Sequence, residues 1–155
     1  MVESKQCLLK YGLPYDDKET TVNENTKFEN KWMTLWDVPA DINTAISVIP
    51  NKIYCNKDLT TPLEKAFRNI IERNLTKEIK TWDGCFNIRL KRGLNSLSLH
   101  SWGIAIDINA AWNGLGKIPT MSKELVQCFI DAGFEWGGNW TRLDGMHFQL
   151  KTING

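Results

Sequence analysis

Two short segments in the second half of the chain alternate between apolar and polar side chains. Every second residue is isoleucine in residues 104–109, and residues 146–151 alternate in the same way. A period of two residues is typical of a strand with one buried face. The pattern therefore predicts two strands in which Asp107 and His147 lie opposite the apolar face.

Helical spacing is clearest over residues 61–79. Thr61-Pro-Leu-Glu64 is typical of a capping box with proline in the first turn. Apolar residues then recur at helical spacing at Leu63, Ala66, Phe67, Ile70 and Ile71. We expect a second helix over residues 122–132, capped by Ser122, and a short one within residues 39–50.

The remaining segments are less regular. Residues 1–30 are polar and predict an extended arm or a short hairpin. Residues 28–38 are rich in tryptophan and predict a strand; these indoles suit a core or packing surface better than the alternative, an aromatic platform for a glycan. A turn at Asp83-Gly84 is expected to lead into a strand over residues 85–90, which carries Arg89.

These elements predict one α+β domain spanning residues 1–155, a length within the range of single domains. We expect a small, mostly antiparallel sheet with the helices near 61–79 and 122–132 packed on one side. A candidate site then lies in a cleft over the polar face of the sheet.

The chemistry of that face centres on the two histidines of the chain, His100 and His147, and on Asp107. Imidazole and carboxylate groups are suitable zinc ligands, and hydrolytic zinc sites commonly have three protein ligands. Gly103 supplies a turn that lets His100 fold back beside Asp107. Asp144, three residues before His147, is placed to transfer protons beside a metal.

The same residues resemble the family of zinc D-Ala-D-Ala carboxypeptidases and L-alanyl-D-glutamate peptidases. The family pattern Ser-x-His-x-x-Gly-x-Ala-x-Asp runs from Ser98 to Asp107, and Asp144-Gly-Met-His147 supplies the second motif. The resemblance extends over about residues 82–150.

By resemblance, His100, Asp107 and His147 bind Zn²⁺, and Asp144 is the catalytic acid and base. The family also has an upstream arginine that orients the substrate or stabilises an oxyanion. Arg89 fits that arginine best by spacing, and Arg92 is the alternative.

Three further residues are candidates for binding substrate, namely Ser98 in the first motif and the indoles of Trp136 and Trp140. The segment 133–140 resembles the one that precedes the last ligand in phage-type members, and it predicts either a cleft wall or a lid over the core. One position departs from the family, because many relatives carry glutamate where this chain has Gln149.

The resemblance implies a zinc-dependent peptidoglycan peptidase acting on the stem peptide. We expect an L-alanyl-D-glutamate endopeptidase of the phage or prophage endolysin type. The alternatives are a D-alanyl-D-alanine carboxypeptidase and a non-catalytic wall-binding or virion module. A related zinc fold with another substrate, such as the signalling domain of hedgehog proteins, is more remote.

Composition and charge indicate which binding partners and which cellular location to expect. The formal net charge of +1 argues against duplex DNA as a partner. We expect no membrane insertion, a monomer, and synthesis in a bacterial cytoplasm without a signal peptide, because residues 1–10 lack an apolar core. The protein would then reach the wall through a holin or as part of a virion. The four cysteines lack C-x-x-C spacing and are expected to be reduced and buried.

Overall fold

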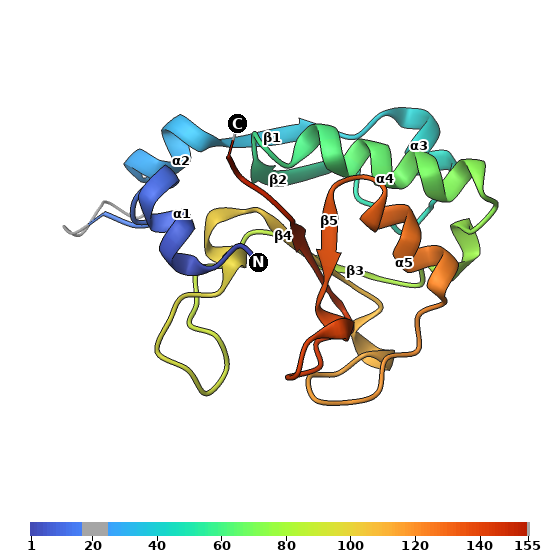
Figure 1. Cartoon of the computed structure of the whole chain (residues 1–155). Helices are drawn as coiled ribbons and strands as arrows, with labels where there is room; N and C mark the ends of the chain where they lie inside the picture. The colour runs from blue at the N-terminus through green and yellow to red at the C-terminus, as the bar shows by residue number, and fades with distance from the viewer. Residues whose placement is uncertain (17–24, 155) are drawn as a thin grey trace.

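The computed structural model describes residues 1–16 and 25–154 and has the predicted α+β class (Figure 1). The described helices are α1 Ser4–Tyr11, α2 Lys27–Trp32, α3 Ala40–Ala45, α4 Thr60–Glu72 and α5 Lys123–Ile130. The short 3₁₀ helices are η1 Thr76–Glu78, η2 Leu99–Trp102, η3 Ala110–Trp112 and η4 Gly137–Asn139. The strands are β1 Met33–Asp37, β2 Lys52–Asn56, β3 Trp82–Gly84, β4 Ala105–Ile108, β5 Phe134–Trp136 and β6 His147–Leu150.

The strands form two antiparallel sheets. β1 pairs with β2, and the four-stranded sheet has the order β3-β4-β6-β5. The two strands predicted from alternation are β4 and β6, which are neighbours at the centre of the larger sheet. Their register places Asp107 opposite His147, so the predicted polar positions share one face.

The opposite face of the four-stranded sheet is apolar and closed. Ile106 pairs with Phe148 across β4 and β6, and the ring of Phe148 stacks on Phe129 of α5 with centroids 4.2 Å apart. Helices α4 and α5 pack against each other on this side (Figure 1), where Asn69 donates a hydrogen bond to the Cys128 carbonyl. The prediction that helices cover one side of the sheet is confirmed.

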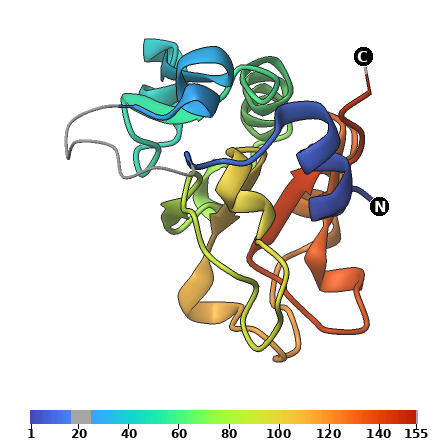
Figure 2. The same cartoon turned by 90° about the vertical axis from the view of Figure 1, so that its left-hand side faces the viewer.

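The N-terminal prediction of an extended arm or hairpin is wrong. Residues 4–11 and 27–32 are helices, and α1 begins where the Glu3 amide donates to Gln6 Oε1. Helix α1 packs against η2 (Figure 2) and buries Cys7 and Tyr11. The part of the predicted arm over residues 17–24 lies outside the described residues.

Three other boundaries differ from prediction. Helix α4 starts at Thr60 without a side-chain cap and ends at Glu72, because Asn74 adopts a positive φ of 57°. The segment 28–38 is half helix and half strand. Residues 85–90 are not a strand, since the segment 85–89 hydrogen-bonds to η2 instead of a β-ladder.

The tryptophans of segment 28–38 pack against the protein core. Trp36 stacks on Phe67 at a centroid distance of 6.4 Å, and Trp32 meets Tyr11 edge to face at 4.8 Å. These contacts agree with the packing interpretation. No helix in the described part of the chain combines the length and apolar character needed to cross a bilayer.

Candidate metal site and active-site cavity

His100 is held in place by the turn that surrounds it. The Ser98 hydroxyl accepts a hydrogen bond from the His100 amide at the start of η2. Gly103 ends η2 with a φ of 69°. A Cβ at Gly103 would lie 2.8 Å from the backbone nitrogen of Asn56, so the chain can turn here only with glycine. The predicted role of Gly103 in folding His100 back toward Asp107 agrees with this geometry.

The ligand atoms of His100, Asp107 and His147 converge from η2, β4 and β6. His100 Nε2 lies 3.2 Å from Asp107 Oδ2 and 3.2 Å from His147 Nδ1. His147 Nδ1 lies 3.6 Å from Asp107 Oδ1. Donor atoms around a tetrahedral zinc ion lie roughly 3.3 Å apart, given metal–ligand bonds of about 2.0–2.1 Å. The spacing of the three residues therefore fits such an ion.

The hydrogen bonds on the outer sides of the His100 and His147 rings also favour a cation bound between the two rings. His100 Nδ1 lies 2.6 Å from the Cys85 carbonyl oxygen, and His147 Nε2 lies 2.9 Å from Gln149 Oε1. Both partners are acceptors, so each outer nitrogen carries the proton of a neutral ring. Two lone pairs then face each other across the centre, and they repel unless a proton or a cation lies between them.

One buried oxygen at this centre has no partner. Among the residues that the structure describes, Asp107 Oδ1 is the one buried polar side-chain atom that has no hydrogen-bond partner. An unpaired buried carboxylate oxygen is costly, and such groups call for an explanation. A bound metal ion would satisfy it, so the donor set fits Zn²⁺.

The charges at the centre support the same interpretation. Burial opposes ionisation of Asp107, but its close contact with His100 and His147 holds the pKa of Asp107 well below its ordinary value. Burial disfavours charge on His147, yet Asp107 raises the pKa of His147 above its ordinary value. The buried carboxylate thus remains negative and attracts positive charge to the space between the rings.

Asp144 lies beside this centre because two loops approach each other closely. Its Oδ2 is 4.0 Å from His147 Nδ1, and its backbone amide donates to the Gly137 carbonyl. A Cβ on Gly137 would lie 2.4 Å from the Asp144 carbonyl oxygen, which explains why glycine is needed there. Burial raises the pKa of Asp144 above its ordinary value, and the nearby His147 offsets only part of that rise. Asp144 is thus next to the candidate ligands without being one of the converging three.

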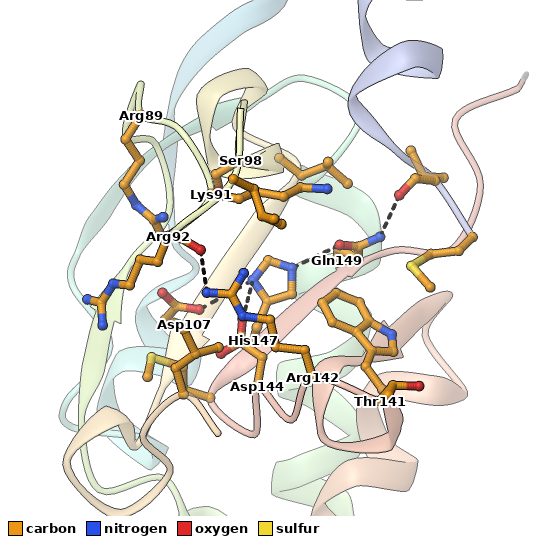
Figure 3. A pocket seen from close by; sticks show the side chains of 17 residues that line it. Arg89, Lys91, Arg92, Ser98, Asp107, Thr141, Arg142, Asp144, His147 and Gln149 are labelled. Atoms are coloured by element: carbon orange, nitrogen blue, oxygen red, sulfur yellow. Dashed lines mark hydrogen bonds and ion pairs between the residues drawn. The ribbon is translucent and has the colours of Figure 1, made fainter. Parts of the chain in front are cut away.

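A cavity of about 350 Å³ opens over Asp107, Asp144 and His147 (Figure 3). Its other lining residues include Ser98, Trp140, Gln149 and four cationic side chains, Arg89, Lys91, Arg92 and Arg142. A volume of this order suits a small ligand or a short peptide segment. The cavity gives solvent and ligand access to the candidate metal site.

Both candidate arginines line the cavity, but they differ in orientation. Arg89 is half-buried, and its charge is close enough to lower the pKa of Asp144. Arg92 is exposed, and its side chain extends away from His147 (Figure 3). The geometry thus agrees with the spacing argument that preferred Arg89.

The three predicted substrate-binding residues occupy different positions. Ser98 is buried and lines the cavity while capping η2, and the Trp140 ring lies 5.3 Å from the His147 ring. Trp136 is outside the cavity lining, on the apolar face of β5, where it stacks on Phe148. Its indole nitrogen donates to the Gly145 carbonyl and so supports the Asp144 loop.

Sequence reasoning did not assign a role to Gln149, Glu135 or Val2. Gln149 is buried, and its amide nitrogen donates to Glu135 Oε1 at 2.8 Å and to the Val2 carbonyl at 3.0 Å. These bonds turn the amide oxygen of Gln149 toward His147. The period of two in β5 and β6 could have identified Glu135, since it pairs with Gln149 on the polar face.

Comparison with known proteins supports the resemblance drawn from the motifs. Residues 92–150 match the model of a family described as D-alanyl-D-alanine carboxypeptidase, a segment that contains His100, Asp107, Asp144 and His147. The resemblance is thus confirmed over this segment, and it supports a peptidase. Arg89 lies outside the match.

Among solved structures, the chain is similar to a crystal structure of the L-Ala D-Glu endopeptidase ChiX of Serratia marcescens. The two share 19% identity with a TM-score of 0.41, and the alignment covers 63% of this chain and 80% of that one. A search of curated proteins found no significant match.

Proposed function

We propose that the protein is a zinc-dependent peptidoglycan peptidase that hydrolyses the stem peptide between L-alanine and D-glutamate. The observation that carries the metal assignment is the unpartnered Asp107 Oδ1 between two imidazoles whose outer nitrogens are already bonded. The family match over residues 92–150 supports peptide hydrolysis.

In this proposal His100 Nε2, His147 Nδ1 and one oxygen of Asp107 would hold the zinc ion. Zinc in such a site lowers the pKa of water and polarises a carbonyl. Cys85 and Gln149 fix the two rings through their outer nitrogens, so the inner nitrogens stay aimed at the metal. The donors are therefore preorganised before the metal binds.

Asp144 moves the proton. Its half-buried carboxylate faces the cavity beside the ligands, where it accepts a proton from the attacking water and returns it to the leaving nitrogen. Arg89, which lines the same cavity, binds a substrate carboxylate or the developing oxyanion.

Two amide bonds of the stem peptide suit this arrangement. In both the L-Ala–D-Glu bond and the terminal D-Ala–D-Ala bond, the residue that supplies the scissile nitrogen carries a carboxylate on the adjacent carbon. A guanidinium beside the proton-transfer group matches either bond. The Trp-Gly-Gly segment before Asp144 resembles phage-type members and favours the endopeptidase, with access to the wall through a holin or a virion.

The experiment that tests this function is digestion of purified peptidoglycan with zinc-loaded protein, followed by mass spectrometry of the products. New N-terminal D-glutamate would support the endopeptidase, and released D-alanine would support the carboxypeptidase. Asp144→Asn is the control that keeps the fold. An absence of metal-dependent products from several wall types would favour the wall-binding module.

The role of Arg89 is tested against Arg92 as a matched control. We expect Arg89→Gln to lower kcat/KM roughly tenfold or more, because a charge-assisted hydrogen bond to the substrate is lost. Arg92→Gln should change it less, since its side chain points away from His147. Equal or reversed effects in steady-state kinetics would transfer the role to Arg92.

A further inference from the structure

The arginines of this chain fall into two groups. Arg68 and Arg73 lie away from the cavity and pair with carboxylates, at 2.8 Å to Asp41 and 2.8 Å to Asp131 respectively. Within residues 1–16 and 25–154, no carboxylate forms an ion pair with any of the three cavity arginines. Among the described residues, the arginines without an ion pair are therefore those at the cavity.

Arg142 is the cavity arginine that connects two loops. It comes from the loop before Asp144, and its guanidinium donates to the backbone carbonyl of Arg92 on the opposite loop (Figure 3). That bond uses one nitrogen of a group that carries five N–H donors. The remaining donors are available to a ligand in the cavity.

The opposite loop adds positive charge at the same place. Residues 90–97 form a hairpin closed by a bridge between Leu90 and Leu97 and by the bond from the Lys91 amide to the Ser96 carbonyl. This hairpin presents Lys91 and Arg92 to the cavity. The side of the cavity formed by Lys91, Arg92 and Arg142 is therefore cationic, while Asp107 and Asp144 supply the acidic groups of the cavity near the metal site.

We propose that Arg142, supported by the charge of Lys91, forms a second carboxylate subsite, separate from the position assigned to Arg89. The proposal rests on the peptidase function and names its substrate class. The preferred peptide carries one carboxylate next to the scissile nitrogen and another on the side chain of the following residue. Arg142 is a specificity residue in this scheme, because it binds substrate away from the reacting atoms.

Two tripeptides isolate that second carboxylate. L-Ala-γ-D-Glu-meso-diaminopimelate and L-Ala-γ-D-Glu-L-lysine share the scissile bond, the first carboxylate and the side-chain amine. They differ by one carboxylate at the end of the third side chain. A preference for the first peptide therefore reports recognition of that group alone.

Binding is measured by calorimetry on zinc-loaded Asp144→Asn protein, which keeps the cavity and prevents turnover. We expect the diaminopimelate peptide to bind roughly tenfold more tightly than the lysine peptide, as for one charge-assisted hydrogen-bonded pair. Adding Arg142→Gln should reduce the preference to less than about twofold. Adding Arg68→Gln, which removes a paired arginine elsewhere, should leave the preference intact.

Equal affinities for the two peptides, including no detectable binding of either, would overturn the subsite. A preference that survives Arg142→Gln would also overturn it. The result of this binding experiment is independent of the peptidoglycan digestion that tests the proposed function. Wall cleavage without discrimination keeps the peptidase and removes the subsite, whereas discrimination without wall cleavage keeps the subsite and removes the peptidase.

Discussion

The two faces of strands β4 and β6 are both largely buried, but one consists of apolar side chains and the other of polar ones. On one face, Ile106 and Phe148 are fully buried among apolar neighbours, and packing alone satisfies them. On the other face, Asp107, His147 and Gln149 are polar, and the buried oxygen Asp107 Oδ1 has no hydrogen-bond partner. The apolar face therefore needs no further group, whereas the polar face needs a bound ligand to pair its buried carboxylate oxygen.

The difference teaches where to look for chemistry in this chain. Buried polar atoms in folded proteins nearly always have partners, so the exception found among the described residues marks a place where another group is bound. The same contrast separates the paired arginines beside α4 and α5 from the unpaired ones at the cavity. The following substitutions test whether the two faces really divide function from stability.

The largest expected effect comes from removing a ligand on the polar face. His147→Ala should lose bound zinc and reduce peptidoglycan cleavage to background, because two remaining donors hold the ion poorly. Metal content after dialysis and product release measure the two losses. Stoichiometric zinc in this variant would rule out His147 as a ligand.

Asp144→Asn should have the next largest effect, and only on turnover. We expect cleavage to fall roughly 10²–10⁴-fold with zinc content unchanged, because the amide cannot accept the proton. Metal analysis and single-turnover kinetics on the same sample separate binding from chemistry. Full activity in Asp144→Asn would refute the proposed proton transfer.

Gln149→Ala should weaken zinc binding by about 10–100-fold, as removal of a group that orients a ligand commonly does. The reason is that His147 Nε2 loses its acceptor and the ring loses its fixed orientation. Competition with a chromophoric chelator measures the affinity. An unchanged zinc affinity in Gln149→Ala would refute this orienting role.

Phe148→Leu, on the opposite face, should have the smallest effect on the site. The free energy of unfolding should fall by about 1–1.5 kcal/mol, because the stacking contact with Phe129 is lost in a well-packed core. Zinc affinity should stay within about threefold of the starting protein. Urea denaturation of metal-free protein and chelator competition check the two statements. A large loss of zinc affinity would show that the faces are not independent.

The sequence predicts the centre of this fold better than its edges. Strict alternation around Asp107 and His147 identified both central strands and their polar face, because a shift of one residue would expose the isoleucines. The strand expected over residues 85–90 does not form, because its amides bond to the turn of η2 instead of to a neighbouring strand. Helix α1 was missed because polar residues outnumber the buried ones in residues 1–16.

The residues of the candidate site also divide into those that the sequence predicts and those that depend on the fold. Residue types and motif spacing brought His100, Asp107, Asp144 and His147 together before any coordinates. The position of Arg142 depends on which loops face each other, which no local pattern encodes. Trp136 was assigned to the cleft from composition, although its alternation with Glu135 already placed it on the apolar face.

The pairing of Asp107 with His147 has a consequence for chain connectivity. A metal held by both residues is a removable crosslink between two strands, and it closes residues 108–146, including α5, into a loop. Chelation would remove that crosslink without breaking a covalent bond, and only the pairing of β4 with β6 would then hold the two ends of the loop together. Susceptibility of this segment to a protease would then follow the supply of zinc, so metal availability would govern the lifetime of the protein as well as its activity.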